Sequence, residues 1–186
     1  MSDIYIPSED SFFMSKFLSK ELKKILINKP NIKFLEIGAG SGINLKTALS
    51  SGVLKKNIFS SDINPKAVNN CISLGFNCIN SNLFKNIPKN KFDAIVFNPP
   101  YLPIDPLEPK SSRLETTGGK NGSELSIKFL KQAKDYLSKS GKIFLITSSL
   151  SKKINFENLG YKSKLIEREK IFFEELYLWE LQSKSV

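Results

Sequence analysis

The residues with the clearest chemical potential are Asn98–Tyr101, an Asn-Pro-Pro-Tyr string that follows an apolar run at Phe92–Phe97. Two consecutive prolines fix the backbone and lack N–H donors, so nearby carbonyl oxygens stay free to accept hydrogen bonds. The Asn98 side-chain oxygen and the Pro99 carbonyl oxygen can each accept one N–H of a planar amide or amino group. An asparagine after a strand can also cap a turn, but the complete string favours a site that holds an NH2 nitrogen.

Such a nitrogen is a poor nucleophile because its lone pair is delocalised into a π system. Two fixed acceptors would orient it toward an electrophilic methyl carbon and stabilise the positive charge that grows on it. We therefore predict a catalytic role for Asn98, Pro99, Pro100 and Tyr101, and substrate contacts from Asn98, Pro99 and Tyr101, whose ring can cover the flat group. The chain has no histidine and two cysteines, so neither a histidine base nor a metal site is expected.

A glycine-rich segment, Glu36–Gly42, directly follows an expected strand at Lys33–Ile37. Gly38 and Gly40 allow a tight turn and close approach of a ligand to the backbone. Ile43 stands where the dinucleotide fingerprint needs a small residue, which disfavours a pyrophosphate and leaves room for a nucleoside with an amino-acid tail. A plain strand-to-helix turn is the other interpretation.

Two further strand ends carry residues suited to a nucleoside. Asp62 ends the expected strand Asn57–Asp62 and can accept hydrogen bonds from two vicinal ribose hydroxyls. It can alternatively be an acid that favours the start of the next helix. Asn82, just after the expected strand Phe76–Asn80, can contact adenine while Leu83 packs on the face of the ring. A turn asparagine explains that position equally well.

Apolar runs alternate with helical patterns along the chain. The expected elements are helices at 9–28, 43–51, 64–74, 123–138 and 151–159, and strands at 33–37, 57–62, 76–80, 92–97, 142–148, 162–169 and 175–182. Gly141 is read as a helix stop, and a proline-rich loop is expected from Pro99 to Gly122. The alternation predicts an α/β fold with a mostly parallel seven-stranded sheet, helices on both faces and an antiparallel C-terminal strand. Ligands of such sheets bind beyond the carboxyl ends of the strands, where all these motifs lie.

Together the motifs resemble the class I S-adenosylmethionine-dependent methyltransferases, and among them the HemK-type glutamine methyltransferases that modify peptide-chain release factors. The resemblance covers most of the chain, with Glu36–Gly42, Asp62–Pro65 and Asn98–Tyr101 in matching order and spacing. Tyr5–Ser11 resembles the Tyr-x-Pro-x-Glu-Asp-Thr opening of the archaeal and eukaryotic branch. Gly118–Glu124 resembles the Gly-Gly-x-x-Gly-x-Glu segment of the same branch.

The resemblance implies a Rossmann-like fold, S-adenosyl-L-methionine as the cofactor, and N5-methylation of the glutamine in the Gly-Gly-Gln motif of a release factor. It implies that the cofactor-binding residues are Ser11, Glu36, Gly38, Gly40, Asp62, Ile63, Asn82, Leu83 and Asn98. Ser11 stands where threonine is usual and keeps the hydroxyl. Asn82 stands where aspartate is usual, so we expect weaker cofactor affinity without loss of activity. One domain is expected over residues 1–186, with residues 1–31 contributing to the cofactor pocket and without the N-terminal helical domain of the bacterial members.

Partners are also implied. Members of this branch work with a small zinc-binding activator subunit that pairs with a sheet edge, and Phe76–Leu83 is the expected docking edge if its strand is terminal. The alternative substrate is an adenine or guanine amino group of a nucleic acid, which the formal charge of +10 supports. A solvated charged surface explains that charge equally well. Only Arg113 and Arg168 are arginines, which weakens that alternative because lysine lacks the bidentate fork.

A third interpretation is a scaffold that binds cofactor without catalysis, and the intact Asn98–Tyr101 string counts against it. No apolar stretch approaches the roughly 18 residues of a membrane span. The N-terminus carries acidic residues where a signal peptide needs a basic start. We therefore expect a cytoplasmic protein without membrane contacts.

Overall fold

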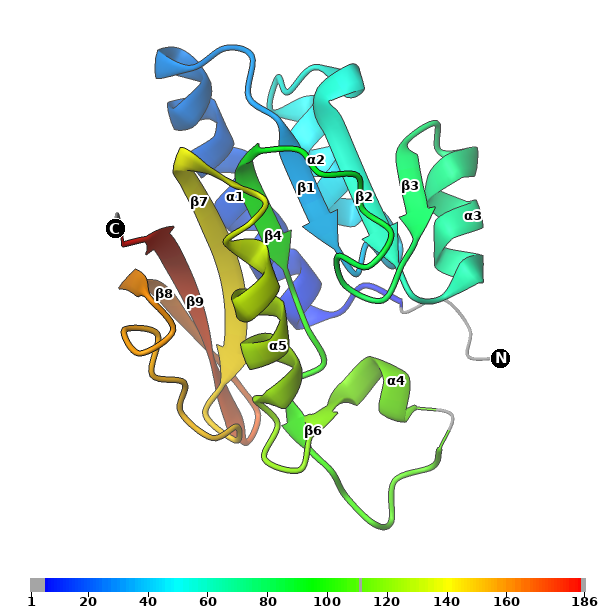
Figure 1. Cartoon of the computed structure of the whole chain (residues 1–186). Coiled ribbons are helices and arrows are strands. Elements are labelled where there is room, and N and C mark those ends of the chain that lie inside the picture. The colour runs from blue at the N-terminus through cyan, green and yellow to red at the C-terminus, as the bar shows by residue number, and fades with distance from the viewer. Residues whose placement is uncertain (1–5, 111, 185–186) are drawn as a thin grey trace.

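A twisted sheet forms the centre of the molecule (Figure 1). The computed structural model describes residues 6–110 and 112–184, so Tyr5 of the opening motif lies outside the described residues. The sheet has seven strands in the order β3-β2-β1-β4-β7-β9-β8. Their bounds are β1 Phe34–Ile37, β2 Ile58–Asp62, β3 Asn77–Asn80, β4 Phe92–Phe97, β7 Leu137–Ser148, β8 Tyr161–Ile171 and β9 Glu174–Ser183.

The strand directions confirm the predicted architecture. From β3 to β7 every pairing is parallel, whereas β9 runs antiparallel to both of its neighbours, β7 and β8. The chain first moves outward from β1 to β2 and β3, and then returns to β4 on the other side of β1. Such a reversal of strand order opens a crevice at the carboxyl ends of the strands, which is where open α/β sheets bind ligands.

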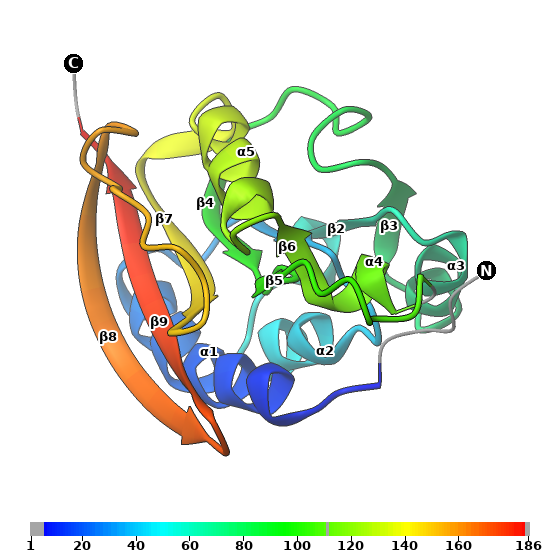
Figure 2. The same cartoon turned by 90° about the horizontal axis from the view of Figure 1, so that it is seen from below.

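Helices cover both faces of the sheet (Figure 2). They are α1 Glu9–Asn28, α2 Ile43–Ser50, α3 Pro65–Ser73, α4 Arg113–Thr116 and α5 Glu124–Ala133, with a 3-10 turn η1 at Lys55–Asn57. Side chains of α1, α2 and α3 pack in one core cluster and those of α5 in the other. Strand β4 serves both clusters because successive side chains alternate: Ala94 and Val96 face the first, Ile95 and Phe97 the second. In the described part of the chain no helix is long and apolar enough to cross a membrane.

The start of α3 follows the prediction from the sequence. The Asn64 side-chain oxygen accepts the Lys66 backbone N–H at 3.0 Å, and Pro65 occupies the first helical turn. Proline costs no hydrogen bond at that position, since its missing N–H would have no partner within the helix. The cap fixes where α3 begins, and so fixes the short turn at Ile63 that follows Asp62, the last residue of β2.

Helix α5 is shorter than the helix predicted at 123–138, and the strand after it is longer than predicted. Helix α5 ends at Ala133 rather than at Ser138, and β7 already begins at Leu137. Gly141 was read as a helix stop, but it lies inside β7, where the pairing with β4 shifts register after Phe92. A Cβ atom on Gly141 would lie 2.8 Å from the Phe92 carbonyl oxygen. The glycine therefore permits a close approach at a bulge, a position that sequence alone does not distinguish from a helix end.

The helix predicted at 151–159 is absent: residues 152–155 have no regular structure and residues 156–160 form turns. Asn155 provides the physical reason, because its side-chain oxygen accepts the Asn158 backbone N–H at 2.9 Å and so competes with helical hydrogen bonding. Phe156 nonetheless anchors the segment. It is buried and packs on Trp179 of β9, with 5.0 Å between the ring centroids. The Trp179 indole N–H donates to the Thr147 hydroxyl at 2.9 Å.

The expected loop from Pro99 to Gly122 has local structure of its own. Its first part pairs with its last part through the short strands β5 (Leu102–Pro103) and β6 (Thr117–Gly119). The short helix α4 lies between them in sequence. The pairing folds the loop back onto the end of β4, and so brings α4 beside the crevice (Figure 1).

Candidate active site

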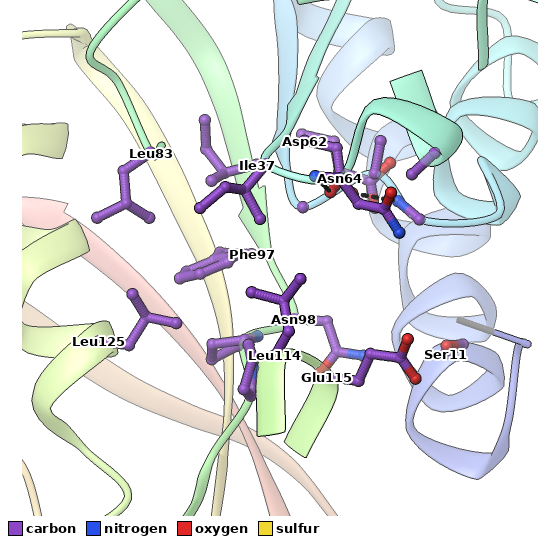
Figure 3. Close-up of a pocket in the computed structure, with 18 of the residues that line it drawn as sticks. Ser11, Ile37, Asp62, Asn64, Leu83, Phe97, Asn98, Leu114, Glu115 and Leu125 are labelled. Carbon is purple, nitrogen blue, oxygen red and sulfur yellow. Dashed lines mark hydrogen bonds between the residues drawn. The ribbon is translucent and has the colours of Figure 1, made fainter. Parts of the chain in front are cut away.

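A cavity of about 320 Å³ lies at the carboxyl ends of β1, β2 and β4. Figure 3 shows its polar and apolar residues. Every residue predicted to bind the cofactor lines it, and so do three of the four residues predicted to be catalytic. The lining includes Ser11, Glu36, Gly38, Gly40, Asp62, Ile63, Asn82, Leu83, Asn98, Pro99 and Pro100. The structure thus brings residues from distant parts of the sequence to one place.

The turn after β1 is shaped by glycines in left-handed backbone conformations. Gly38 has φ of 72° and Gly40 has φ of 50°. The Gly38 and Ala39 N–H groups donate to the Ser61 carbonyl oxygen at 2.8 and 3.1 Å. The Gly40 N–H donates to the Asp62 carboxylate at 2.8 Å. These bonds tie the glycine turn to the end of β2 and form one continuous wall of the cavity.

Asp62 is held rigidly at that wall. One carboxylate oxygen accepts the Gly40 N–H and the other accepts the Asn64 N–H, each at 2.8 Å. Burial raises the pKa of Asp62, and the hydrogen bonds from the Asn64 and Gly40 backbone oppose that rise. Each carboxylate oxygen can accept a second hydrogen bond. Vicinal hydroxyl groups of a ligand in the cavity therefore fit this position.

Glu36 is buried, and among the described residues only one of its two carboxylate oxygens has a hydrogen-bond partner. One carboxylate oxygen accepts the Asn44 side-chain N–H at 2.8 Å. The other is buried and has no hydrogen-bond partner among the described residues. Burial raises the pKa of Glu36 well above its usual value, and the nearby carboxyl of Asp62 raises it further. A buried acceptor without a partner is costly, so a hydrogen-bond donor on a cavity ligand fits here. Asn44, which orients this carboxylate, was not among the predicted site residues.

The raised pKa of Glu36 leads to a prediction about stability. A carboxyl whose folded-state pKa is raised stabilises the fold fully below its unfolded value of about 4.3, and that contribution is lost as pH rises toward the folded value. The ligand-free protein should therefore lose up to about 1.4 kcal/mol of stability per pH unit across that window. Glu36→Gln should flatten this dependence and weaken cofactor binding. Denaturant melts at several pH values check it, with exposed Glu167→Gln as the control. If the free energy of unfolding depended on pH with the same slope in Glu36→Gln and Glu167→Gln, the prediction would be contradicted.

The opposite wall of the cavity is apolar. Ile37, Leu83, Phe97 and Leu125 lie around the same space in Figure 3. Leu83 has φ of 53°, a strained value for a residue with a side chain. The Ser81 hydroxyl stabilises that turn by donating to the Leu83 carbonyl at 2.8 Å. These side chains offer an apolar surface suited to a flat ring, and the contact of Leu83 with adenine stays a prediction.

Asn82 lies exposed at the rim of this wall. Restoring a carboxylate with Asn82→Asp should tighten binding of S-adenosylhomocysteine about fivefold, because a charge-assisted hydrogen bond is stronger than a neutral one by roughly 1 kcal/mol. Isothermal titration calorimetry measures the change. Asn158→Asp adds the same charge at an exposed position outside the cavity and should leave the affinity unchanged. Unaltered affinity in Asn82→Asp would show that residue 82 does not contact the ligand.

Asn98 is oriented by a residue from the other end of the chain. Its side-chain N–H donates to the Asp10 carboxylate at 3.0 Å, across 88 positions of sequence. The Asn98 side-chain oxygen is buried and has no partner among the described residues. The predicted acceptor is therefore free at the cavity wall. Asp10 also lines the cavity, but the sequence assigned a role only to its neighbour Ser11. Its place in the Tyr5–Ser11 motif was the available signal.

Tyr101 does not share this cavity. Tyr101 lines a second cavity, of about 720 Å³, together with Thr147 and Trp179, and packs against the first core cluster. Its backbone carbonyl accepts the Ser151 hydroxyl at 2.5 Å. The structure thus separates Tyr101 from Asn98, Pro99 and Pro100, and a role for its ring over a substrate group stays a prediction.

The Gly118–Glu124 motif packs against the backbone of the Asn98–Tyr101 string. A Cβ atom on Gly118 would lie 2.6 Å from the Pro100 carbonyl oxygen, and one on Gly122 would lie 2.3 Å from that of Tyr101. The Glu124 carboxylate accepts the Asn121 backbone N–H at 3.0 Å and so closes the turn between them. The motif is thus a tight turn that fits directly against the string.

The loop before that motif forms a further wall of the cavity. Leu114, Glu115 and Thr117 line the cavity, and Figure 3 shows Leu114 and Glu115 beside Asn98. Arg113 also lines it, and its guanidinium donates to the Glu108 carbonyl oxygen at 3.3 Å. Of these residues the sequence had singled out only Arg113.

Fold and site together define an S-adenosylmethionine-dependent methyltransferase. Among solved structures the chain is similar to Mtq2 from the E. cuniculi Mtq2–Trm112 complex, with a TM-score of 0.68, 22% identity, and coverage of 96% of this chain and 98% of that one. It is also similar to a methyltransferase from Bacteroides fragilis in complex with S-adenosyl-L-homocysteine, with a TM-score of 0.55, 20% identity, and coverage of 98% and 86%.

Sequence relatives narrow the class. The chain is 36% identical to a putative protein N5-glutamine methyltransferase from Methanocaldococcus jannaschii, over 94% of this chain and 89% of that protein. It is 30% identical to the eRF1 methyltransferase catalytic subunit mtq2 of Schizosaccharomyces pombe (81% and 74% covered) and 32% identical to human methyltransferase HEMK2 (78% and 72% covered). A model of the Eco57I restriction-modification methylase family matches residues 53–173. The chain belongs to the protein N5-glutamine methyltransferase family.

Proposed function

We propose that this enzyme methylates the side-chain amide nitrogen of the glutamine in the Gly-Gly-Gln motif of a peptide-chain release factor, and so acts in translation termination in the cytoplasm. The single observation that carries the proposal is the buried, unpartnered side-chain oxygen of Asn98 at the wall of the cavity. An acceptor in that state fits an N–H donor of the substrate. The relatives named as glutamine and eRF1 methyltransferases support the choice of amide.

The chain's own residues suit both halves of the reaction. Asp62 and Glu36 offer acceptors for hydroxyl and amino groups, and Leu83 and Phe97 offer an apolar surface for adenine. S-Adenosyl-L-methionine, when bound, supplies an electrophilic methyl carbon. The Asn98 side-chain oxygen and the Pro99 carbonyl oxygen each accept one N–H of the glutamine amide. That arrangement fixes the direction of the nitrogen and stabilises the positive charge that develops there.

A transfer assay tests the proposal. The purified enzyme is incubated with labelled S-adenosylmethionine and either the release factor or RNA from the same organism. We expect label on the release factor, and we expect it to vanish when the motif glutamine is replaced by alanine. Label that survives that replacement, or label on RNA alone, would refute the proposal.

A nucleic-acid amino group is the second candidate substrate. The match to the restriction-modification methylase model and the net charge of +10 favour it. The opening motif, which contributes Asp10 and Ser11 to the cavity, lies outside the region matched by that model. Because these residues belong to the segment that resembles the release-factor branch, the protein substrate is the better supported choice.

A small zinc-binding activator subunit is proposed as the partner, docking on β3. In the described part of the chain that strand lies at one end of the sheet and pairs with β2 alone, so its outer edge has no strand partner. The structurally similar Mtq2 of E. cuniculi was solved as a complex with Trm112. We further propose one domain over residues 1–186, with residues 1–31 contributing to the pocket through Asp10 and Ser11.

The docking edge can be tested by comparing the two ends of the sheet. Asn77→Lys places a charge on exposed β3 and should weaken co-purification of the subunit. Ser163→Lys places the same charge on exposed β8 at the opposite edge and should not. Monodisperse, fully active enzyme made without any partner would count against a required activator.

A further inference from the structure

One hydrogen bond joins the start of α1 to the catalytic string. The Asn98 side-chain N–H donates to the Asp10 carboxylate at 3.0 Å, and Asp10 is buried. We infer that Asp10 is a positioning residue: it holds the Asn98 amide with its oxygen toward the substrate and its nitrogen away. This inference rests on the proposed role of Asn98 as an acceptor and adds the group that enforces that role.

The need for such a group follows from the shape of an amide. The oxygen and the NH2 of asparagine are nearly equal in size, so a rotation of the side chain by half a turn exchanges an acceptor for two donors. In the exchanged state Asn98 would face the NH2 group of a substrate with its own N–H donors. An ionised carboxylate accepts hydrogen bonds only. Asp10 therefore permits one orientation of Asn98 and opposes the other.

Asp10 is itself fixed in place. The carboxylate oxygen that does not bind Asn98 accepts the Ser11 backbone N–H at 2.6 Å and the Ser8 hydroxyl at 3.0 Å. Asp10 also lies in the first turn of α1, a helix of 20 residues, where the helix dipole favours a negative charge. These contacts leave the second carboxylate oxygen directed at Asn98.

The bond has an electronic consequence as well as a geometric one. Donation from the Asn98 N–H to a charged acceptor polarises the amide and increases the negative charge on its oxygen. That oxygen then accepts a substrate N–H more strongly as positive charge develops on the substrate nitrogen. Asp10 thus supports the reaction without contacting the substrate nitrogen.

An exchange of the two side chains tests the inference. Asn98→Asp alone puts two carboxylates at hydrogen-bond distance, and we expect kcat to fall at least tenfold. Asp10→Asn alone keeps an acceptor without its charge, and we expect a loss of a few fold. In the double variant the amide introduced at position 10 can donate to the carboxylate introduced at position 98, whose second oxygen faces the cavity. We expect the double variant to be at least fivefold more active than Asn98→Asp.

Several readouts separate positioning from a structural role. The melting temperature and the affinity for S-adenosylhomocysteine are measured for each variant, and exposed Glu9→Gln removes a neighbouring charge in the same helical turn as the control. A double variant that binds this analogue like the wild type but is no more active than Asn98→Asp would overturn the inference.

If the proposed function is wrong, the wild-type enzyme itself will not methylate the release factor in the transfer assay, before any variant is compared. The exchange can then use any NH2 substrate that the enzyme methylates. A substrate-free readout is the NMR signal of the Asn98 side-chain amide protons. That signal should shift in Asp10→Asn and remain unchanged in Glu9→Gln, and an unchanged signal in Asp10→Asn would equally overturn the inference.

Discussion

Replacing Asn98 with alanine is expected to lower kcat for methyl transfer by about 10²–10³-fold, the range found when one preorganised polar group is removed from an active site. The physical reason is the loss of the buried side-chain oxygen that faces the cavity. The fold should remain, since among the described residues the side-chain bond lost is that to Asp10, worth roughly 1–3 kcal/mol including the cost to the carboxylate. Steady-state kinetics and a thermal melt measure both effects.

The matched control is Asn69→Ala on α3, an exposed asparagine that does not line the cavity. It should have wild-type kcat. The affinity of Asn98→Ala for S-adenosylhomocysteine should change far less than its kcat, because most cofactor contacts remain. Wild-type turnover in Asn98→Ala would show that the mechanism is wrong.

Adding one methyl group at Gly122 is expected to lower kcat about 10²-fold although Gly122 does not line the cofactor cavity. A Cβ atom there would lie 2.3 Å from the Tyr101 carbonyl oxygen, so the backbone of the Asn98–Tyr101 string must move. Displacements of about 1 Å at a reacting group can cost that factor. The measurement is kcat with saturating cofactor, compared with the dissociation constant of S-adenosylhomocysteine, which should change little.

Backbone strain alone must be separated from this displacement. Gly122 has φ of 81°, where a side chain is unfavourable whatever the space. Gly52→Ala is the control, because Gly52 also has positive φ, of 106°, but its Cβ would only contact the Leu26 side chain at 3.4 Å. It should lose stability and keep kcat. Equal losses of kcat in both variants would rule out a specific role for the motif.

The cofactor side of the site could be predicted from the sequence because of how parallel sheets are built. Glu36, Asp62 and Asn82 each lie at or just beyond the end of a different strand. Carboxyl ends of parallel strands share one edge, so local patterns that identify strand ends also identify neighbours in space. For the same reason the sheet and its antiparallel strand β9 were predicted correctly, whereas the stretch before Gly141 and the turns around Phe156 were not. Those two depend on a bulge and on side-chain hydrogen bonds that have no periodic signature.

The catalytic side was harder to predict because its contacts are not periodic. The family resemblance placed Ser11 and Asn98 in one pocket, but the bond between Asp10 and Asn98 has no sequence signal and appears only in three dimensions. The placement of Tyr101 in a second cavity depends on the direction in which the chain leaves the two prolines. The tight fit of Gly118 against Pro100 likewise requires the pairing of β5 with β6.

The position of Trp179 makes its fluorescence a suitable probe of unfolding. It is the single tryptophan of the chain, and it packs on Phe156 rather than lining the cofactor cavity. Its fluorescence should therefore report loosening of β7 and β9 during denaturation and stay constant when a cofactor analogue binds. One optical signal can then record unfolding curves with and without ligand. The displacement between the curves gives the binding constant by mass action, with no labelled compound.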